Sequence, residues 1–248
     1  MIPLPAYFNR NLLRVLMYHK VVDQAMPDYL TVSTAQLKEQ FQYLLNGGYS
    51  IISMGQLINY TSHKVALPPR PVLLTFDDGY RNNLWQLYPL LQLFQLPATI
   101  FLIGQKTMHA TEVGEAGEYL TAEDIQTMDK GLVSFGIHSY SHESYASLSL
   151  EKVSGDIDYC QFLFDKLGIT VLPCLAYPYG AFPKNDKRKQ ASIEEIFRKK
   201  NIQLAFRIGN RLNRLPLKNR FLVQRIDIRG DESFNKFRRK LKYGNKLL

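Results

Sequence analysis

Short apolar segments of strand type alternate with longer amphipathic segments along most of this chain. The stretch 71–76 is apolar without alternation, as expected for a strand that is covered on both faces. Strands that alternate with helices form a parallel sheet, and at least six strands joined by short loops favour a closed barrel over an open sheet. We therefore expect an α/β fold. The other strands are expected at 13–18, 50–52, 98–103, 133–137, 174–177, 204–206 and 223–227.

Start and stop signals place most of the helices between these strands. Ser33 can cap a helix over 34–45, and Gln36 can complete a capping box there. A helix over 83–94 contains Pro89, which predicts a kink or a later start. Loops are expected at 107–117 and 181–190, and further helices are expected from 121 and over 150–167, 192–200 and about 234–243.

Length and composition bound the organisation of the chain. With 248 residues and 46% hydrophobic content, it can bury one sizeable core, so we expect a single domain over residues 1–248. No run of about 18 apolar residues occurs, and the first ten residues lack the order of a secretory signal. A cytoplasmic location is expected, although a leader absent from this sequence is the alternative. Cys160 and Cys174 match no metal pair, and two free thiols are favoured over a disulfide.

The net charge of +9 is unevenly spread along the chain. Residues 184–248 carry 20 Lys/Arg against 6 Asp/Glu, whereas residues 1–183 carry 11 against 16. This asymmetry indicates an anionic partner, for which membrane lipid, lipid-linked glycan and nucleic acid are candidates, or else a solvated charged face. The basic terminal helix interleaves aromatic and cationic residues, so we expect peripheral contact with an anionic membrane. No nucleic-acid-binding module is recognisable, and specific nucleic acid binding is not expected.

Two fragments carry most of the chemistry. The first places Asp77 and Asp78 directly after the strand at 71–76, and the second places His138 and His142 after the strand at 133–137. The i,i+4 spacing predicts that both histidines lie on one side of a helical turn. Two His and one Asp are a divalent-metal ligand set with room for water, and the second Asp can act as a base. The pattern indicates metal-assisted hydrolysis, against the alternative of an ordinary turn and two surface histidines.

The fragments Thr-Phe-Asp-Asp-Gly at 75–79, His-Ser-Tyr-Ser-His at 138–142 and Ala-Tyr-Pro-Tyr-Gly at 176–180 resemble, in order and spacing, three signature motifs of the polysaccharide deacetylases (carbohydrate esterase family four). The resemblance covers roughly residues 14–228. It implies a distorted (β/α) barrel of about seven parallel strands and removal of acetyl groups from N-acetylated sugars. By this resemblance Asp77 is the base, Tyr179 offers its backbone N–H to the oxyanion, and zinc or a similar divalent metal binds Asp78, His138 and His142.

Two departures from the family pattern affect this interpretation. The usual Arg of the third motif is missing, and we hypothesise that Arg225 steadies Asp77 instead, against the alternative of a plain ion pair. No His follows His142, so the usual late general acid cannot be present. The fragment Val-Leu-Met-Tyr-His at 15–19 resembles the start of a permuted branch that includes biofilm poly-N-acetylglucosamine deacetylases. That resemblance makes His19 the acid, against the alternative of a structural histidine.

The expected function is therefore metal-dependent hydrolysis of acetamido groups on an N-acetylated glycan, which releases acetate and a free amine. Tyr80, Tyr140 and Tyr177 are candidate platforms for sugar stacking, with core packing as their alternative role. Two other functions remain open at this point. The chain could be a glycan-binding protein without catalysis, or it could hydrolyse another small amide on the same barrel.

Overall fold

The computed structural model describes residues 11–24, 28–114 and 117–244. Within this part of the chain, seven parallel strands close into a barrel in the order β1-β11-β9-β8-β7-β6-β5, and β5 pairs again with β1. The α/β barrel expected from the alternation of segments is thus confirmed. The strands are β1 (Leu12–Tyr18), β5 (Pro71–Phe76), β6 (Ala98–Leu102), β7 (Val133–Ile137), β8 (Cys174–Ala176), β9 (Leu204–Ile208) and β11 (Val223–Asp227).

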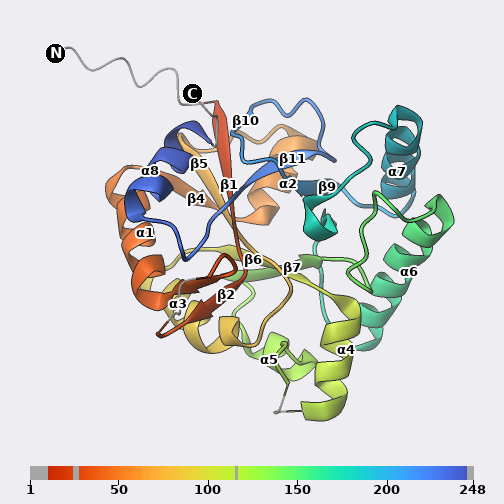
Figure 1. Ribbon diagram of the computed structural model, residues 1–248, viewed down its shortest axis with the longest axis horizontal. Coiled ribbons are helices and arrows are strands. Elements are labelled where there is room, and N and C mark those ends of the chain that lie inside the picture. Colours follow the sequence, from red (N-terminus) through yellow and green to blue (C-terminus); the bar gives the residue numbers. More distant parts are fainter. Residues whose placement is uncertain (1–10, 25–27, 115–116, 245–248) are drawn as a thin grey trace.

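Two short strands extend this barrel, and two more form a sheet of their own. The strand β4 (Ser50–Ile52) pairs in parallel with the start of β5, and β10 (Asn213–Arg214) pairs antiparallel with the start of β1. The strands β2 (Lys20–Val22) and β3 (Thr31–Ser33) form a separate small sheet just past the end of β1 (Figure 1).

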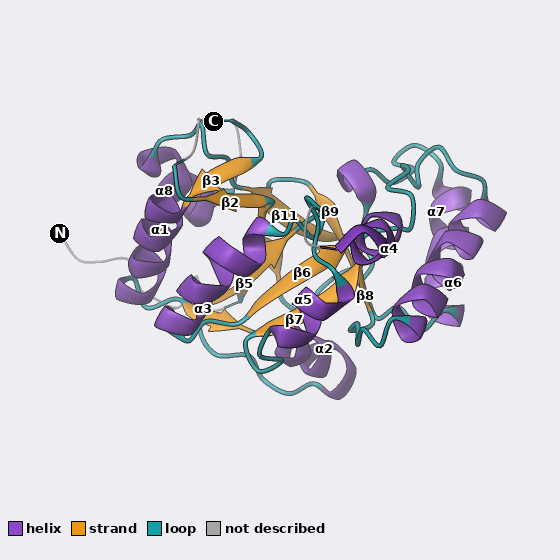
Figure 2. Ribbon diagram, turned by 90° about the horizontal axis from the view of Figure 1, so that it is seen from below, coloured by secondary structure: helices purple, strands orange, loops and turns teal. Residues whose placement is uncertain are grey.

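Eight α-helices in the described residues surround the strands, with α1, α3 and α8 on one side and α6 and α7 on the other (Figure 2). None of the described helices is long and apolar enough to cross a membrane. The helices are α1 (Thr34–Asn46), α2 (Met54–His63), α3 (Tyr88–Phe94), α4 (Gly104–Val113), α5 (Ala122–Thr127), α6 (Leu150–Lys166), α7 (Lys187–Lys199) and α8 (Phe234–Tyr243).

Several local predictions are confirmed. Ser33 caps α1, and Gln36 closes the capping box as expected. Pro89 lies in the first turn of α3, which follows a π-helical turn at Asn83–Leu87, so the α-helix starts later than the periodicity alone indicates. The two cysteines are both buried and free.

The prediction of a loop at 107–117 is wrong, because the helix α4 occupies most of this segment. This helix has no stripe of large apolar residues and packs through small ones, Gly104, Thr107 and Ala110. A Cβ atom on Gly104 would lie 3.0 Å from Tyr140 and 3.2 Å from the Cys160 sulfur, so the close packing against α6 needs glycine. The loop at 181–190 also ends early, because Asp186 caps α7.

The barrel interior and its outer layer form two separate cores. Alternate strand residues such as Leu13, Val15, Leu73, Phe101 and Phe206 fill the interior. The larger core lies between the strands and the surrounding helices. The inward-facing series of β1, β5 and β11 turns from apolar to polar toward the carboxyl end, and this change positions the site.

Candidate active site

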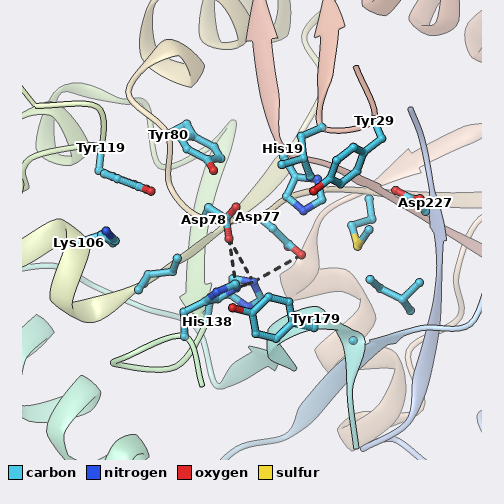
Figure 3. Close-up of a pocket in the computed structure, with 16 residues that line it drawn as sticks. His19, Tyr29, Asp77, Asp78, Tyr80, Lys106, Tyr119, His138, Tyr179 and Asp227 are labelled. Carbon is cyan, nitrogen blue, oxygen red and sulfur yellow. Dashed lines mark hydrogen bonds and ion pairs between the residues drawn. The ribbon is translucent and has the colours of Figure 1, made fainter. Parts of the chain in front are cut away.

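A cavity of about 410 Å³ opens at the carboxyl ends of the barrel strands (Figure 3). This is the end at which barrel enzymes carry their active sites. His19, Asp77, His138 and Asp227 continue the inward-facing series of β1, β5, β7 and β11. The other lining residues are Met17, Tyr29, Leu30, Asp78, Tyr80, Ile103, Lys106, Tyr119, His142, Tyr179, Gly180 and Ile208.

Asp77 and Arg225 form a buried bidentate pair, with guanidinium–carboxylate distances of 2.6 and 2.7 Å. Arg225 reaches Asp77 from β11, which is the arrangement hypothesised from the sequence. Burial raises the pKa of Asp77, but the charges of Arg225 and His138 outweigh that effect and hold the pKa below its ordinary value. Asp77 is therefore a fixed, ionised carboxylate at neutral pH.

Asp78, His138 and His142 bring three ligand atoms together. His138 Nε2 lies 3.4 Å from Asp78 Oδ1 and 3.3 Å from His142 Nε2, and His142 Nε2 lies 3.5 Å from the same carboxylate oxygen. Ligand atoms bound at about 2.0–2.1 Å around one tetrahedral zinc lie about 3.3 Å apart, so the spacing fits such an ion. The buried Asp78 Oδ1 accepts no well-aligned hydrogen bond from the described residues. These three residues could hold a divalent metal.

The protonation of the two histidines also suits a metal. His138 donates from Nδ1 to the Ala176 carbonyl at 2.8 Å, which directs Nε2 toward Asp78. Burial lowers the pKa of His138, but Asp77 and Asp78 outweigh burial and raise it, so two carboxylates attract a cation here. Burial and the neighbouring His138 lower the pKa of His142 to about 4, so His142 is a neutral imidazole at pH 7.

The histidine pair is not carried by a helical turn, and that expectation is wrong. The segment after β7 is an irregular loop in which Ser139 and His142 have left-handed backbones (φ 69° and 61°). Asp156 on α6 holds this loop by accepting hydrogen bonds from the Ser139 hydroxyl and the Tyr140 N–H, both at 2.9 Å. Sequence reasoning missed Asp156, because an acidic residue on an amphipathic helix is usually a solvent-facing one.

His19 lies at the end of β1 and faces the cavity opposite His138 (Figure 3). Its Nδ1 atom is buried and has no hydrogen-bond partner among the described residues. Asp227 lines the same wall, and its pKa is raised by burial, while the charges of Lys240 and His19 oppose that rise. Asp227 was not predicted as a site residue. Its signal in the sequence was its position two residues after Arg225 on one face of β11.

Tyr179 lies at the cavity rim, where its ring centroid is 4.6 Å from that of His142. Its side chain is 67% exposed and its backbone is left-handed (φ 56°). The next residue, Gly180 (φ 60°), packs on β9, and a Cβ atom there would lie 2.4 Å from Ile208. The close approach and the left-handed backbone at position 180 both require glycine, and they fix the backbone next to Tyr179 at the cavity rim.

The three candidate sugar platforms are placed differently. Tyr80 lines the cavity and stacks on Tyr119 with 5.1 Å between ring centroids. Tyr140 packs edge-on against Tyr159 at 4.5 Å and does not line the cavity. Tyr177 is 2% exposed in the outer core. Tyr177 thus belongs to the outer core and Tyr140 packs against that core, and neither lines the cavity.

Comparison with known proteins identifies the family. The polysaccharide deacetylase family model matches residues 64–199, more than half of the chain. The chain belongs to the polysaccharide deacetylase family. The matched region contains both Asp77–Asp78 and the His138–His142 loop, whereas His19 and Arg225 lie outside it.

Curated relatives of this deacetylase-family chain differ in length. The Bacillus subtilis relative YxkH is 25% identical over 170 residues, which are 68% of this chain and 57% of that protein. The poly-beta-1,6-N-acetyl-D-glucosamine N-deacetylase of Escherichia coli (strain K12) is 38% identical over 88 residues, which are 35% of this chain and 13% of the enzyme. The chain therefore spans less than two thirds of these two relatives. The Staphylococcus aureus (strain MRSA252) enzyme of the same name is 22% identical over 234 residues, covering 89% and 75%.

Solved structures share the fold. A Streptococcus pyogenes deacetylase in complex with acetate superposes with a TM-score of 0.76 at 22% identity, covering 93% of this chain and 98% of that one. IcaB from Ammonifex degensii superposes with a TM-score of 0.74 at 21% identity, covering 94% and 96%. These likenesses show that the barrel fold is shared.

Proposed function

We propose that this protein is a metal-dependent deacetylase that hydrolyses acetamido groups on N-acetylated sugars of a polysaccharide or oligosaccharide. One observation carries the proposal: Asp77, which Arg225 holds from behind, lines the same cavity as the ligand set Asp78, His138 and His142. The relatives named as poly-beta-1,6-N-acetyl-D-glucosamine N-deacetylases support an N-acetylglucosamine polymer as the substrate class.

Asp78, His138 and His142 are the residues proposed to hold the metal, with zinc favoured by the nitrogen-rich ligand set. A metal bound there supplies Lewis acidity to the acetyl carbonyl and lowers the pKa of water toward neutrality. Because His142 is neutral at pH 7 and Asp78 is ionised, two of the three ligands need no deprotonation to bind.

Asp77 is proposed as the general base that takes a proton from the attacking water. Its Oδ2 atom lies 3.7 Å from His138 Nε2, so the carboxylate borders the ligand set without belonging to it. Arg225 holds both carboxylate oxygens, which fixes the orientation of Asp77 and keeps it ionised. The pair therefore sets the position and the protonation state of the base together.

His19 is proposed as the general acid that protonates the departing sugar nitrogen. This proton is needed because an amine anion is a very poor leaving group. Asp227 lines the same cavity wall as His19 and places a carboxylate on the side of the proposed acid. The backbone N–H of Tyr179 is proposed to donate to the oxyanion, and one such donor contributes about 3–4 kcal/mol to transition-state binding.

The decisive experiment measures acetate release from N-acetylglucosamine oligomers by the zinc-loaded protein, the chelated protein and an Asp77→Asn variant. We expect release that needs metal and is lost in the variant. If the protein binds stoichiometric metal and oligomer but releases no acetate, it is a glycan-binding protein. If it binds metal but not the oligomer, the substrate is another amide, and formyl and cyclic amides are the next to test.

A further inference from the structure

Four segments of the chain contain no Asp or Glu at all: 1–22, 40–76, 196–226 and 233–248. Together they carry 20 of the 31 Lys and Arg residues. The described strands β1, β5, β9 and β11 lie in three of these segments, apart from Asp227, the last residue of β11. They are neighbours in the barrel, in the order β9-β11-β1-β5. One continuous sector of the barrel is thus built from sequence that is almost free of carboxylates.

Several cations of this sector lie at the amino ends of its strands. Arg214 pairs with Leu12 at the start of β1, and Arg70 immediately precedes β5. The guanidinium of Arg70 lies 3.9 Å from the centre of the Tyr49 ring, and that of Arg14 lies 5.1 Å from the same centre. Arg14 also donates to the Leu241 carbonyl at 2.9 Å, which brings Lys242 at the end of α8 to the same place. Separate parts of the chain therefore meet at one end of the barrel.

A groove of about 610 Å³ lies at the same end of the barrel and contains further cations. Lys64, Lys218 and Arg220 line it together with Tyr60, Thr61, Pro216 and Leu217, and no carboxylate lines it. The Arg220 carbonyl accepts from the Ala205 N–H at 2.9 Å, which places the groove at the start of β9. We define the basic end face as Lys64, Arg70, Arg214, Lys218, Arg220 and Lys242.

The positive charges of the basic end face are not neutralised by ion pairs. Within the described ranges, none of its six cations forms an ion pair with a carboxylate. Lys64, Arg214, Lys218 and Lys242 are exposed. By contrast, Arg198, Lys200 and Lys236, which are basic residues elsewhere in the same quarter of the chain, pair with carboxylates of their own. A row of unpaired exposed cations retains its attraction for an anionic surface.

Exposed apolar side chains are interspersed with these cations. Val65 is 56% exposed beside Lys64, and Tyr243 is 53% exposed beside Lys242. Within α8, the helix expected to contact a membrane, Phe237 and Leu241 are instead buried in the larger core. Basic residues mixed with a few aromatic and aliphatic ones are typical of surfaces that rest on anionic lipid headgroups.

We propose that the basic end face docks the protein peripherally on an anionic phospholipid bilayer, with the catalytic cavity directed away from the lipid. The geometry gives this orientation, because β1 starts at the basic end face and ends next to His19 in the cavity. Seven residues of strand separate the two ends by about 20 Å. In Figure 1 the start of β1 and β10 lie at the top of the view, and β2 lies past the other end of β1. The proposal is independent of the proposed hydrolysis.

The test is flotation with vesicles of equal phosphatidylglycerol and phosphatidylcholine, beside vesicles of phosphatidylcholine alone. The protein should bind only the anionic vesicles and be released at 1 M salt. The triple variant Lys64→Glu, Arg214→Glu, Lys218→Glu should bind at least about a hundred-fold more weakly, because loss of each of the three cations alone weakens binding about five-fold and the new carboxylates are repelled as well. The matched control changes Lys38, Lys152 and Lys187 to Glu, which alters net charge equally on other surfaces, and it should retain binding within about five-fold.

The single tryptophan, Trp85, reports orientation because it follows β5 on the cavity side and is 56% exposed. Brominated lipids should leave its fluorescence unchanged, and they should quench a Trp85→Phe, Tyr243→Trp variant. Equal loss of binding in the matched control, or quenching of Trp85, overturns the proposal. Tighter binding to duplex DNA than to vesicles at the same salt would assign the face to a polyanion instead. Thermal unfolding of the triple variant, unchanged from the parent, shows that its weaker binding is not misfolding.

Discussion

Arg225 controls both the position and the charge of the proposed base, so its substitution should change a pH profile. Arg225→Met removes the charge that offsets the burial of Asp77, and the pKa of Asp77 should rise. Because the base must be ionised, the acidic limb of kcat/KM should move to higher pH, with a loss of about 10²-fold at neutral pH. Arg225→Lys keeps the charge and should shift the limb less. An acidic limb that stays in place in both variants would mean that Arg225 only packs.

His19 can be separated from a structural histidine by varying the leaving group. His19→Gln should lower acetate release from an N-acetylglucosamine oligomer by about 10²–10⁴-fold, because the amine then leaves without a proton. Hydrolysis of 4-nitrophenyl acetate should fall far less, since nitrophenolate needs no proton to depart. The comparison uses steady-state rates of both substrates with the same metal-loaded preparation. An equal loss on both substrates would contradict the acid role.

Sequence could identify most of the residues at the ends of buried strands, and it missed Asp227 at the end of β11 and Asp156 on α6. Asp77, Asp78 and His138 each come immediately after an apolar run, so a barrel brings them to one end. Asp227 was passed over although it lies two residues after Arg225 in the same inward-facing series, because it belongs to none of the three motifs that pointed to the site. The role of Asp156 depends on the left-handed loop after β7, which no spacing in the sequence predicts.

The capping box of α1 gives a measurable stability. Ser33 accepts from the Gln36 N–H at 3.1 Å, and the Gln36 side chain accepts from the Ser33 N–H at 2.9 Å. Ser33→Ala should lower the free energy of unfolding by about 1 kcal/mol, because it leaves a helix N–H without its partner. Urea unfolding measures the change. Ser33→Asp restores an acceptor and should stay within about 0.5 kcal/mol of the parent. Equal destabilisation by both substitutions would place the effect in packing instead.

The same capping signature was present where a helix was overlooked. Ser53 and Gln56 form a capping box at the start of α2, with the spacing that identified α1. The ten-residue α2 buries only Met54, Leu57 and Ile58, so its apolar periodicity is too short to recognise. Thus the capping residues of α2 were a usable signal in the sequence. The helix α4 packs through small residues and has neither a capping side chain nor a stripe of large apolar residues, so it left no such signal.

Closure of the barrel depends on contacts that no local pattern describes. The first strand, β1, lies between β5 and the last strand, β11, and thereby joins the two ends of the chain. Sequence indicated parallel strands but not which of them are neighbours, since pairing is set by how the helices pack on the outer core. This closure brings Arg225 to Asp77 across 148 residues of sequence. The substitute for the missing motif Arg therefore exists only in the closed barrel.

Because the proposed metal ligands come from two strand ends, loading the site should stabilise the whole barrel. Metal that binds only the folded state at about a hundred times its Kd adds about 2.7 kcal/mol, which for a chain of this size raises Tm by about 5–10 °C. Calorimetry with zinc and with chelator measures the shift. Asp78→Asn should abolish most of it, whereas His19→Gln should keep it, because His19 lies outside the ligand set. Zinc that leaves Tm unchanged in the parent protein would count against the ligand set, whatever the activity.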